Sequence, residues 1–267
     1  MNNDVNEKKT GLDIAQEGRV LRLTINDPAT RNSIGPALMD AARAAFDAAA
    51  VDSGVGAVVL TGAEGAFCSG GNLKWLKEAR NGDREAVRAG VESFHAMIRS
   101  LRACPKPVIA AVEGPAGGAG FPLALACDLI VAAEDAVFTL AYIKVALTSD
   151  GGGTASLARA LPPQLAAEIL FEGGRVGASR LAQLGMVNRL TAPGGALAEA
   201  TAWAERLADG PTAALGRAKG LLEVAYGGLS AQLDRERDAF VESLFHDEAG
   251  EGVTAFFEKR VAVFPKG

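Results

Sequence analysis

Cysteine and histidine are scarce in this 267-residue sequence. The three cysteines, Cys68, Cys104 and Cys127, are widely spaced and form no CxxC pair, which argues against a disulfide framework and favours the reduced thiols of a cytoplasmic protein. Neither His95 nor His246 has a second histidine or a cysteine within three to five residues, the spacing typical of metal ligands. The sequence therefore predicts a cytoplasmic protein without a metal site.

Long apolar runs and excess positive charge are also missing. No segment reaches about 18 consecutive apolar residues, so no membrane span is predicted. The first ten residues, MNNDVNEKKT, are polar and lack the apolar stretch of a secretory signal, and we interpret residues 1–10 as a flexible tail. The formal net charge of -5 gives no general electrostatic footprint for nucleic acid. We expect neither a membrane nor a nucleic-acid partner.

Two glycine-rich turns each follow an apolar, β-branched run. CSGGNL covers Cys68–Leu73 after the run at Val58–Thr61, and EGPAGGAGF covers Glu113–Phe121 after the run at Pro107–Val112. If both runs are strands of one sheet, both turns lie at the same edge, where glycine lets a ligand approach the main chain closely. Two backbone N–H groups aimed at one point stabilise a developing oxyanion. The alternative is that these are tight turns that only allow close helix packing.

The hydrophobic pattern repeats strand, loop and helix along most of the chain. Strands are predicted at Arg19–Ile25, Ala57–Thr61, Val108–Val112, Leu129–Ala132, Val137–Thr139 and Met186–Leu190. Helices are predicted at Pro36–Ala50, Asp83–Leu101, Gln164–Phe171 and Ala178–Leu184, with a short one after the second glycine turn that ends at Ala126. This order is typical of a mostly parallel sheet with crossover helices, an α/β fold.

From about residue 192 the pattern becomes helical. Four segments have helical periodicity: Gly195–Ala208, Thr212–Ala225, Leu229–Leu244 and Gly252–Arg260. We predict a core over residues 11–192 and a helical C-terminal region over residues 193–267 that serves oligomerisation. The second glycine turn does not complete a dinucleotide fingerprint, because Leu123 stands where the third small residue belongs, and no P-loop motif exists.

Three segments in this order resemble one known family. A strand followed by CSGGNL, then PKPVIAAVEGPAGGAG from Pro105, then LALACDLIVAAEDAVF from Leu123 resemble the crotonase superfamily, the enoyl-CoA hydratase/isomerase enzymes. The resemblance extends from Asp27 to Arg260. It implies a spiral of ββα units with a helical C-terminal trimerisation region, assembled as a homotrimer or a dimer of trimers. It also implies an acyl-CoA thioester as substrate, with coenzyme A as part of that substrate and no separate cofactor.

The resemblance assigns positions for binding. The thioester carbonyl would lie between the backbone amides of Gly71 and Ala119, and Ala119 replaces the glycine usual at that point. Coenzyme A contacts would come from the main chain near Ala29, Arg31 and Ser33, and from the segment that contains Gly70, Asn72 and Leu73. Phe257 and Lys259 match terminal positions that approach the adenine end of a neighbouring subunit's ligand. Arg31 as a solvated surface residue and Phe257 as ordinary helix packing are the alternatives.

The family's two hydratase glutamates are missing. Pro122 stands at the first position and Tyr142, in the substrate site, at the second, and neither is a suitable base at neutral pH. Asp150, in TSDGGGT, matches an aspartate that several isomerases of the family carry. The combination predicts double-bond isomerisation with Asp150 as the single acid and base, the oxyanion being held by Gly71 and Ala119.

Other functions remain open at this point. Asp150 as a helix cap is the structural alternative. A dehalogenase or hydrolase would use Asp150 as nucleophile and His95 as base, although a histidine on the Asp83–Leu101 helix more often packs. A hydratase with a non-standard site is a third possibility. A non-catalytic scaffold that binds CoA esters or RNA is the fourth. Trp75 and Leu76 are expected either to border the acyl site or to pack in the core.

Overall fold

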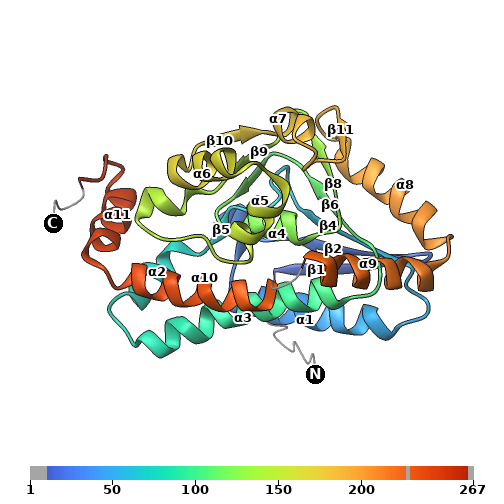
Figure 1. The fold of residues 1–267 in the computed structure, drawn as a ribbon, viewed down its shortest axis with the longest axis horizontal. Helices are drawn as coiled ribbons and strands as arrows, with labels where there is room; N and C mark the ends of the chain where they lie inside the picture. Colours follow the sequence, from blue (N-terminus) through green and yellow to red (C-terminus); the bar gives the residue numbers. More distant parts are fainter. Residues whose placement is uncertain (1–10, 227–228, 264–267) are drawn as a thin grey trace, which may run out of the picture.

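The main sheet has six strands in the order β1-β2-β4-β6-β8-β11 in the computed structural model, which describes residues 11–226 and 229–263 (Figure 1). β1 and β2 form an antiparallel hairpin and the remaining neighbours are parallel, which confirms the predicted α/β class. The strands are β1 (Leu12–Glu17), β2 (Val20–Ile25), β4 (Ala57–Gly62), β6 (Val108–Val112), β8 (Leu129–Ala133) and β11 (Arg189–Thr191).

Two small sheets and the helices complete the architecture. The small sheets consist of β10 (Arg175–Gly177), β9 (Val137–Thr139) and β7 (Pro115–Gly117), and of β3 (Ser33–Ile34) and β5 (Gly70–Gly71). The helices are η1 (Pro28–Thr30), α1 (Pro36–Val51), α2 (Leu73–Ala79), α3 (Arg84–Ala103), α4 (Gly120–Ala126), η2 (Ala141–Val145), α5 (Gly153–Ala160), α6 (Pro163–Glu172), α7 (Ala178–Gln183), α8 (Ala196–Ala208), α9 (Thr212–Tyr226), α10 (Leu229–Leu244) and α11 (Asp247–Glu258).

Both faces of the main sheet are buried, which explains its near-continuous apolar strands. Successive strand residues point to opposite faces, so Val58 and Leu60 join the large core while Ala57 and Val59 join a second cluster on the outer face. α8 covers that outer face with a stripe of alanines at every fourth residue: Ala196, Ala200, Ala204 and Ala208 (Figure 1). Small side chains allow this helix to lie close to the strands.

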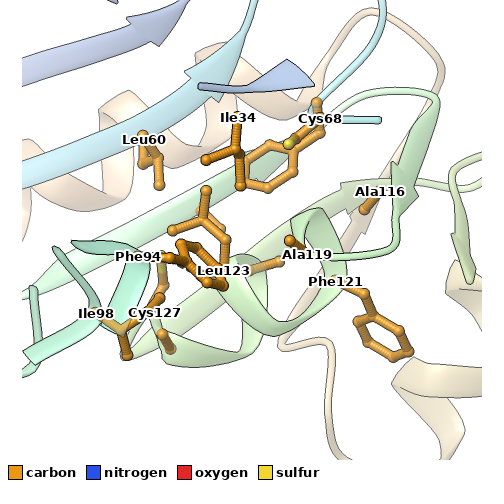
Figure 2. Close-up of a cluster of buried hydrophobic side chains, with 14 of the residues drawn as sticks. Ile34, Leu60, Cys68, Phe94, Ile98, Ala116, Ala119, Phe121, Leu123 and Cys127 are labelled. Carbon is orange, nitrogen blue, oxygen red and sulfur yellow. Dashed lines mark hydrogen bonds between the residues drawn. The ribbon is translucent and has the colours of Figure 1, made fainter. Parts of the chain in front are cut away.

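α4 and α5 lie inside the molecule, between the main sheet, the β9–β10 region and the helices α3 and α10 (Figure 1). Leu123 of α4 and Ala119, the residue just before this helix, lie on the side of Ile34 and Cys68, whereas Phe121 points away from them (Figure 2). Glycine is required where α4 begins, because a Cβ on Gly120 would lie 2.5 Å from the Cys68 carbonyl oxygen. The enclosed position of α4 brings the second glycine turn against the first.

Some boundaries differ from the sequence prediction. The strand expected over Met186–Leu190 begins at Arg189, because the Met186 N–H and the Val187 N–H both donate to the Leu181 carbonyl and extend the turn after α7. The last helix begins at Asp247 rather than at Gly252, after a His246 side chain that accepts the Glu248 N–H. β1, β7, β10 and α2 were not predicted.

The structure leaves two predictions about regions of the chain untested. The predicted tail at residues 1–10 lies outside the described residues. The division at residues 192 and 193 stays a prediction, and α8, just after it, packs on the core sheet. Within residues 11–226 and 229–263, no helix has the length and apolar character of a membrane span. In the same residues, no three histidine, cysteine or carboxylate side chains cluster as metal ligands.

Candidate active site

The two glycine turns lie side by side because β4 and β6 are parallel neighbours. The Cys68 N–H donates to the Pro115 carbonyl at 3.1 Å, and the Gly117 N–H donates to the Cys68 carbonyl at 2.8 Å. Gly70 has φ +101°, and a Cβ there would lie 2.7 Å from the Gly117 carbonyl and 3.0 Å from the Ala119 nitrogen. A side chain at Gly70 would therefore push the two turns apart.

The two amides expected to bind an oxyanion have different surroundings. Ala119 immediately precedes α4, with φ -61°, and within the described part of the chain no acceptor takes its N–H. Its methyl group belongs to the large core (Figure 2), so the departure from glycine is accommodated by packing. Gly71 is exposed, and a Cβ there would meet no atom within 4 Å. Open space at Gly71 and an unpaired N–H at Ala119 suit a bound carbonyl oxygen.

The segment expected to contact coenzyme A lies against the first glycine turn. The Ser69 N–H donates to the Arg31 carbonyl at 3.0 Å, and β3, which begins at Ser33, pairs with β5. Ala29 and Arg31 are exposed and Ser33 is half-buried. Arg31 and Ser33 therefore lie beside the first glycine turn, and Ala29 lies two residues before Arg31.

Asn32 was missed by sequence reasoning although it holds this segment in place. Its side chain is fully buried and donates to the Ala63 carbonyl at 2.9 Å and to the Ala66 carbonyl at 2.6 Å. Its oxygen accepts the Asp27 N–H at 2.9 Å. The signal available in the sequence was an asparagine after a proline turn, where a left-handed residue is tolerated; Asn32 has φ 62°.

The residues after Gly71 are used by α2. The Asn72 side chain caps this helix by accepting the N–H groups of Lys74 at 3.0 Å and Trp75 at 3.3 Å. Leu76 is buried, and the Trp75 ring lies so close to Gly90 of α3 that a Cβ there would be 2.8 Å from it. Packing accounts for these two side chains without a ligand. Leu73, the first residue of α2, is partly buried against the core.

Phe257 and Lys259 lie at the end of α11, close to α2 of the same chain. The Lys77 Nζ lies 4.9 Å from the centre of the Phe257 ring, a cation–π contact, and Phe257 packs partly against the core. Lys259 ends the helix with φ 54° and is exposed. Packing therefore accounts for part of Phe257, and the expected contact of both residues with a neighbouring subunit's ligand stays a prediction.

Asp150 forms a buried pair with Tyr142. Asp150 is 6% exposed, and its Oδ1 accepts the Tyr142 hydroxyl at 2.5 Å. Burial raises the pKa of Asp150 to about 7; the hydrogen bond from Tyr142 opposes this rise and the negative charge of Glu236 adds to it. Burial and the nearby carboxylate raise the pKa of Tyr142 well above its ordinary value. The pair thus joins a carboxyl group that titrates near neutral pH to a phenol that stays protonated.

Asp150 does not cap the helix that follows it with its side chain. α5 has Gly152 at its N-cap position, without a side-chain cap from within the loop. Glu236 of α10 takes this role, accepting the Gly152 N–H at 2.6 Å and the Thr154 N–H at 3.1 Å. Sequence reasoning missed Glu236. The available signal was a carboxylate on the apolar face of a helix, between the buried Leu233 and Phe240.

His95 contacts the same loop with a ring nitrogen. The side chain is fully buried and its Nε2 accepts the Gly151 N–H at 3.1 Å, while Nδ1 has no partner within the described part of the chain. Burial, and next the positive charge of Arg99, lower the pKa of His95 to about 4. His95 is therefore neutral at physiological pH and its Nε2 lone pair is occupied.

Pro122 connects the loop of Asp150 to the oxyanion turn. A Cβ on Gly151 would lie 3.1 Å from Pro122 Cβ, and a Cβ on Gly153 would lie 3.0 Å from Pro122 Cγ. The loop thus packs against the first turn of α4, the helix that Ala119 precedes. Pro122, which the resemblance aligns with a hydratase glutamate, is thus part of this contact.

Comparison with known proteins identifies the family of this chain. A family model described as Enoyl-CoA hydratase/isomerase matches residues 15–267. The chain is 34% identical over 260 residues to a 2,3-dehydroadipyl-CoA hydratase of Escherichia coli, covering 94% of this chain and 97% of that protein. It is similar to the crystal structure of an enoyl-CoA hydratase from Polaromonas sp. JS666, with 45% identity, a TM-score of 0.79 and coverage of 95% and 99%.

A second solved structure matches more closely in shape. An enoyl-CoA hydratase from Mycobacterium avium subsp. paratuberculosis K-10 gives a TM-score of 0.87 at 31% identity, covering 96% of this chain and 99% of that one. The fold is therefore the α/β crotonase fold, with mixed sheets and C-terminal helices, as predicted. The family model covers nearly the whole chain, and the chain belongs to the enoyl-CoA hydratase/isomerase family.

Proposed function

We propose that this protein is a crotonase-type enoyl-CoA isomerase in which Asp150 moves one proton between two carbons of an acyl-CoA thioester. The observation that carries the proposal is the buried Tyr142–Asp150 pair, in which the pKa of Asp150 is about 7. A group that titrates near the working pH is well suited to accept and return a proton. Pro122 offers no second acid or base nearby.

The thioester carbonyl binds between the Gly71 N–H and the Ala119 N–H. These two donors stabilise the negative charge that develops on the oxygen when a proton leaves the adjacent carbon. The coenzyme A portion contacts the main chain at Ala29, Arg31 and Ser33, which lie beside this site. No metal is required for this stabilisation, because the backbone donors are fixed by the fold.

Migration then takes two proton transfers. The Asp150 carboxylate removes the α proton of a 3-enoyl thioester, and the electron pair of that C–H bond delocalises onto the thioester oxygen. The resulting carboxylic acid returns the proton at the γ carbon, the double bond forms between the α and β carbons, and the carboxylate is regenerated. Water is neither consumed nor released.

Tyr142 keeps Asp150 ready for this cycle. Its hydroxyl donates to one carboxylate oxygen, which favours the ionised form and leaves the other oxygen for the substrate. Its own raised pKa means that it remains a donor throughout the neutral pH range. The phenol therefore orients the carboxylate without exchanging a proton itself.

Hydration is the second candidate, and the names of the similar proteins favour it. It requires a water molecule that is positioned and split at the double bond, a task that two glutamates perform in the family's hydratases. With Pro122 and Tyr142 at those positions, one carboxylate would have to do both. The hydrolase alternative has less support, because the Nε2 of His95 already accepts the Gly151 N–H.

The test is a product analysis in deuterated water. The protein is incubated with a panel of 2-enoyl- and 3-enoyl-CoA esters, and products are identified by mass spectrometry and NMR. We expect migration with deuterium incorporation, and a loss of roughly 100- to 10,000-fold in Asp150→Asn. Asp135→Asn is the matched control, because Asp135 is exposed and lies two residues after the end of β8. Hydration that persists in Asp150→Asn, or release of free acid, would refute the assignment.

Assembly and location belong to the same proposal. A homotrimer or a dimer of trimers in the cytoplasm is expected from the family resemblance. Sedimentation velocity measures the assembly, and a mass corresponding to a monomer would contradict it. Binding of the neighbouring subunit's ligand by Phe257 and Lys259 depends on that assembly.

A further inference from the structure

The loop that carries Asp150 is held by acceptors from two distant helices. The Gly151 N–H donates to Nε2 of His95 on α3 at 3.1 Å, and the Gly152 N–H donates to Oε2 of Glu236 on α10 at 2.6 Å. Gly151 and Gly152 have φ +62° and +80°, a left-handed conformation that a residue with a side chain would adopt only with strain. Two successive N–H groups after Asp150 are therefore fixed from outside the loop.

Glu236 is completely engaged by this task. Its Oε1 accepts the Thr154 N–H at 3.1 Å and also the Thr154 hydroxyl, and that hydroxyl oxygen accepts Gln232 Nε2 at 2.6 Å. Glu236 is 4% exposed. Burial raises the pKa of Glu236, and the donors that converge on its two oxygens oppose this rise and favour the ionised carboxylate.

The helices that supply the two acceptors are tied to each other. Arg99 of α3 contacts Glu92 at 2.6 Å and Asp234 of α10 at 3.3 Å. Arg237 of α10 contacts the same Glu92 at 2.9 Å and Asp234 at 3.2 Å. Glu92 and Arg99 flank His95 in sequence, and Arg237 follows Glu236. The ion network therefore fixes the distance between the helices at the level of the loop.

We propose that Glu236, together with His95, is a positioning residue for Asp150: it holds the Gly151–Thr154 backbone so that the Asp150 carboxyl faces the thioester site. Neither residue touches the substrate. This inference rests on the proposed function of Asp150. It explains why a charged side chain is buried in α10 at a point where an apolar residue would otherwise pack.

Glu236 also acts on Asp150 through its charge. Tyr142 from η2 donates a hydrogen bond to Asp150, the charge of Glu236 from α10 acts on it, and neutral His95 of α3 accepts the N–H of the next residue, Gly151. After burial, the negative charge of Glu236 is the remaining cause that raises the pKa of Asp150. Removing that charge lowers the pKa of Asp150. The pH at which the base form appears then moves to lower values.

Two variants separate position from charge. In Glu236→Gln, one acceptor oxygen is replaced by a donor, so we expect kcat to fall by roughly 10- to 100-fold through misplacement of Asp150, and the acid limb of kcat/KM to move to lower pH. In Glu236→Asp the charge remains but the acceptors recede, so kcat should fall while the acid limb stays. Glu242→Gln is the matched control, because this α10 glutamate is exposed and pairs with Arg84.

The hydrogen bond from the Gly151 N–H to His95 is tested by a separate pair of variants. His95→Gln retains an acceptor for the Gly151 N–H, whereas His95→Leu removes it. We expect His95→Leu to lose more of kcat than His95→Gln, with KM changed little in both. Equal losses in the two variants would overturn the role of the hydrogen bond to Gly151.

A titration distinguishes failure of this inference from failure of the proposed function. The carboxyl ¹³C signal of Asp150, assigned with Asp150→Asn, reports its pKa without turnover. A pKa of Asp150 that is lower in Glu236→Gln than in wild type, and unchanged in Glu242→Gln, supports the inference even if the wild type moves no double bond. An unchanged pKa together with unchanged kcat in folded Glu236→Gln overturns it. If Glu236→Gln does not fold, an unchanged kcat in Glu236→Asp overturns it.

Discussion

The two buried carboxylates of this protein lie in one region and differ in how they are satisfied. Asp150 receives one side-chain hydrogen bond in the described structure, from Tyr142. Glu236 receives the Gly152 N–H, the Thr154 N–H and the Thr154 hydroxyl. Burial raises the pKa of both groups, and the donors oppose this rise at Glu236. Under the proposed function, the number of donors as well as burial distinguishes the carboxylate that exchanges protons from the one that stays structural.

The largest effect on stability should come from removing the charge of Asp150, the carboxylate with fewer hydrogen-bond donors. The pKa of Asp150 is about 7 in the fold against 3.8 for the ordinary group, so ionised Asp150 destabilises the folded state by at most about 4 kcal/mol above pH 7. Since the folded state binds a proton that the unfolded state has lost, wild-type stability falls as pH rises from about 4 to 7. Asp150→Asn should remove this loss. Urea unfolding from pH 4 to 8.5 measures it.

The control for that experiment is Asp135→Asn, because Asp135 is exposed. Its stability should follow the wild type at every pH. Parallel wild-type and Asp150→Asn curves across the whole range would contradict the high pKa of Asp150, and with it the contrast between the two carboxylates.

Removing the fully satisfied carboxylate should have the opposite effect on stability. Glu236→Leu leaves the Gly152 and Thr154 N–H groups without acceptors in a buried site. This loss destabilises the folded state by about 3 kcal/mol. The free energy of unfolding, measured by urea at pH 7, should fall by that amount. Glu242→Leu at an exposed position of the same helix should change it by less than about 0.5 kcal/mol. Similar values for the two variants would remove the structural role of Glu236.

Removing the Tyr142 hydroxyl should have a smaller effect, a rise in the pKa of Asp150. Tyr142→Phe deletes the hydrogen bond that lowers the pKa of Asp150, so this pKa should rise and the acid limb of kcat/KM should move to higher pH. A hydrogen bond to a charged group contributes about 1.5 kcal/mol, roughly one pH unit. The direction is opposite to that expected for Glu236→Gln. A shift of both variants in the same direction would show that the limb does not report Asp150.

The smallest effect concerns a cap supplied locally instead of from a distant helix. Asn72→Ala removes the acceptor for the Lys74 and Trp75 N–H groups at the start of α2. The expected loss of folding free energy is about 1 kcal/mol. This should be less than the loss in Glu236→Leu, because the exposed N–H of Lys74 can bond to water. Thermal unfolding measures both. Asn81→Ala, at an exposed position after the same helix, should leave stability unchanged.

Much of the fold could be predicted because its signals are local. Each β-branched run before a glycine turn became a strand, and the helices α3, α8 and α10 follow the predicted periodicity closely. β7 and β10 were missed because each has only three residues and contains glycine, which carries no side chain to mark a period. The strand at Arg189 was displaced because a turn after α7 uses the preceding amides.

In the candidate site too, residues with local signals were predicted and residues with distant partners were missed. Asp150 and the turns around Gly71 and Ala119 were predicted from spacing and family resemblance, and their role in a site stays a prediction. Asn32 and Glu236 were missed because their partners lie far away in sequence; Glu236 and Gly152 are separated by 84 residues. No local pattern states that a helical glutamate will cap a helix formed so much earlier in the chain.

The sequence by itself determined most of the longer strands and helices, the two glycine turns and the family, because periodicity and backbone freedom are properties of short segments. The tertiary structure alone decided that Tyr142 donates to Asp150 and that Glu236 holds the neighbouring glycines. It also decided the pKa of Asp150, because desolvation exists only when the surrounding core is assembled.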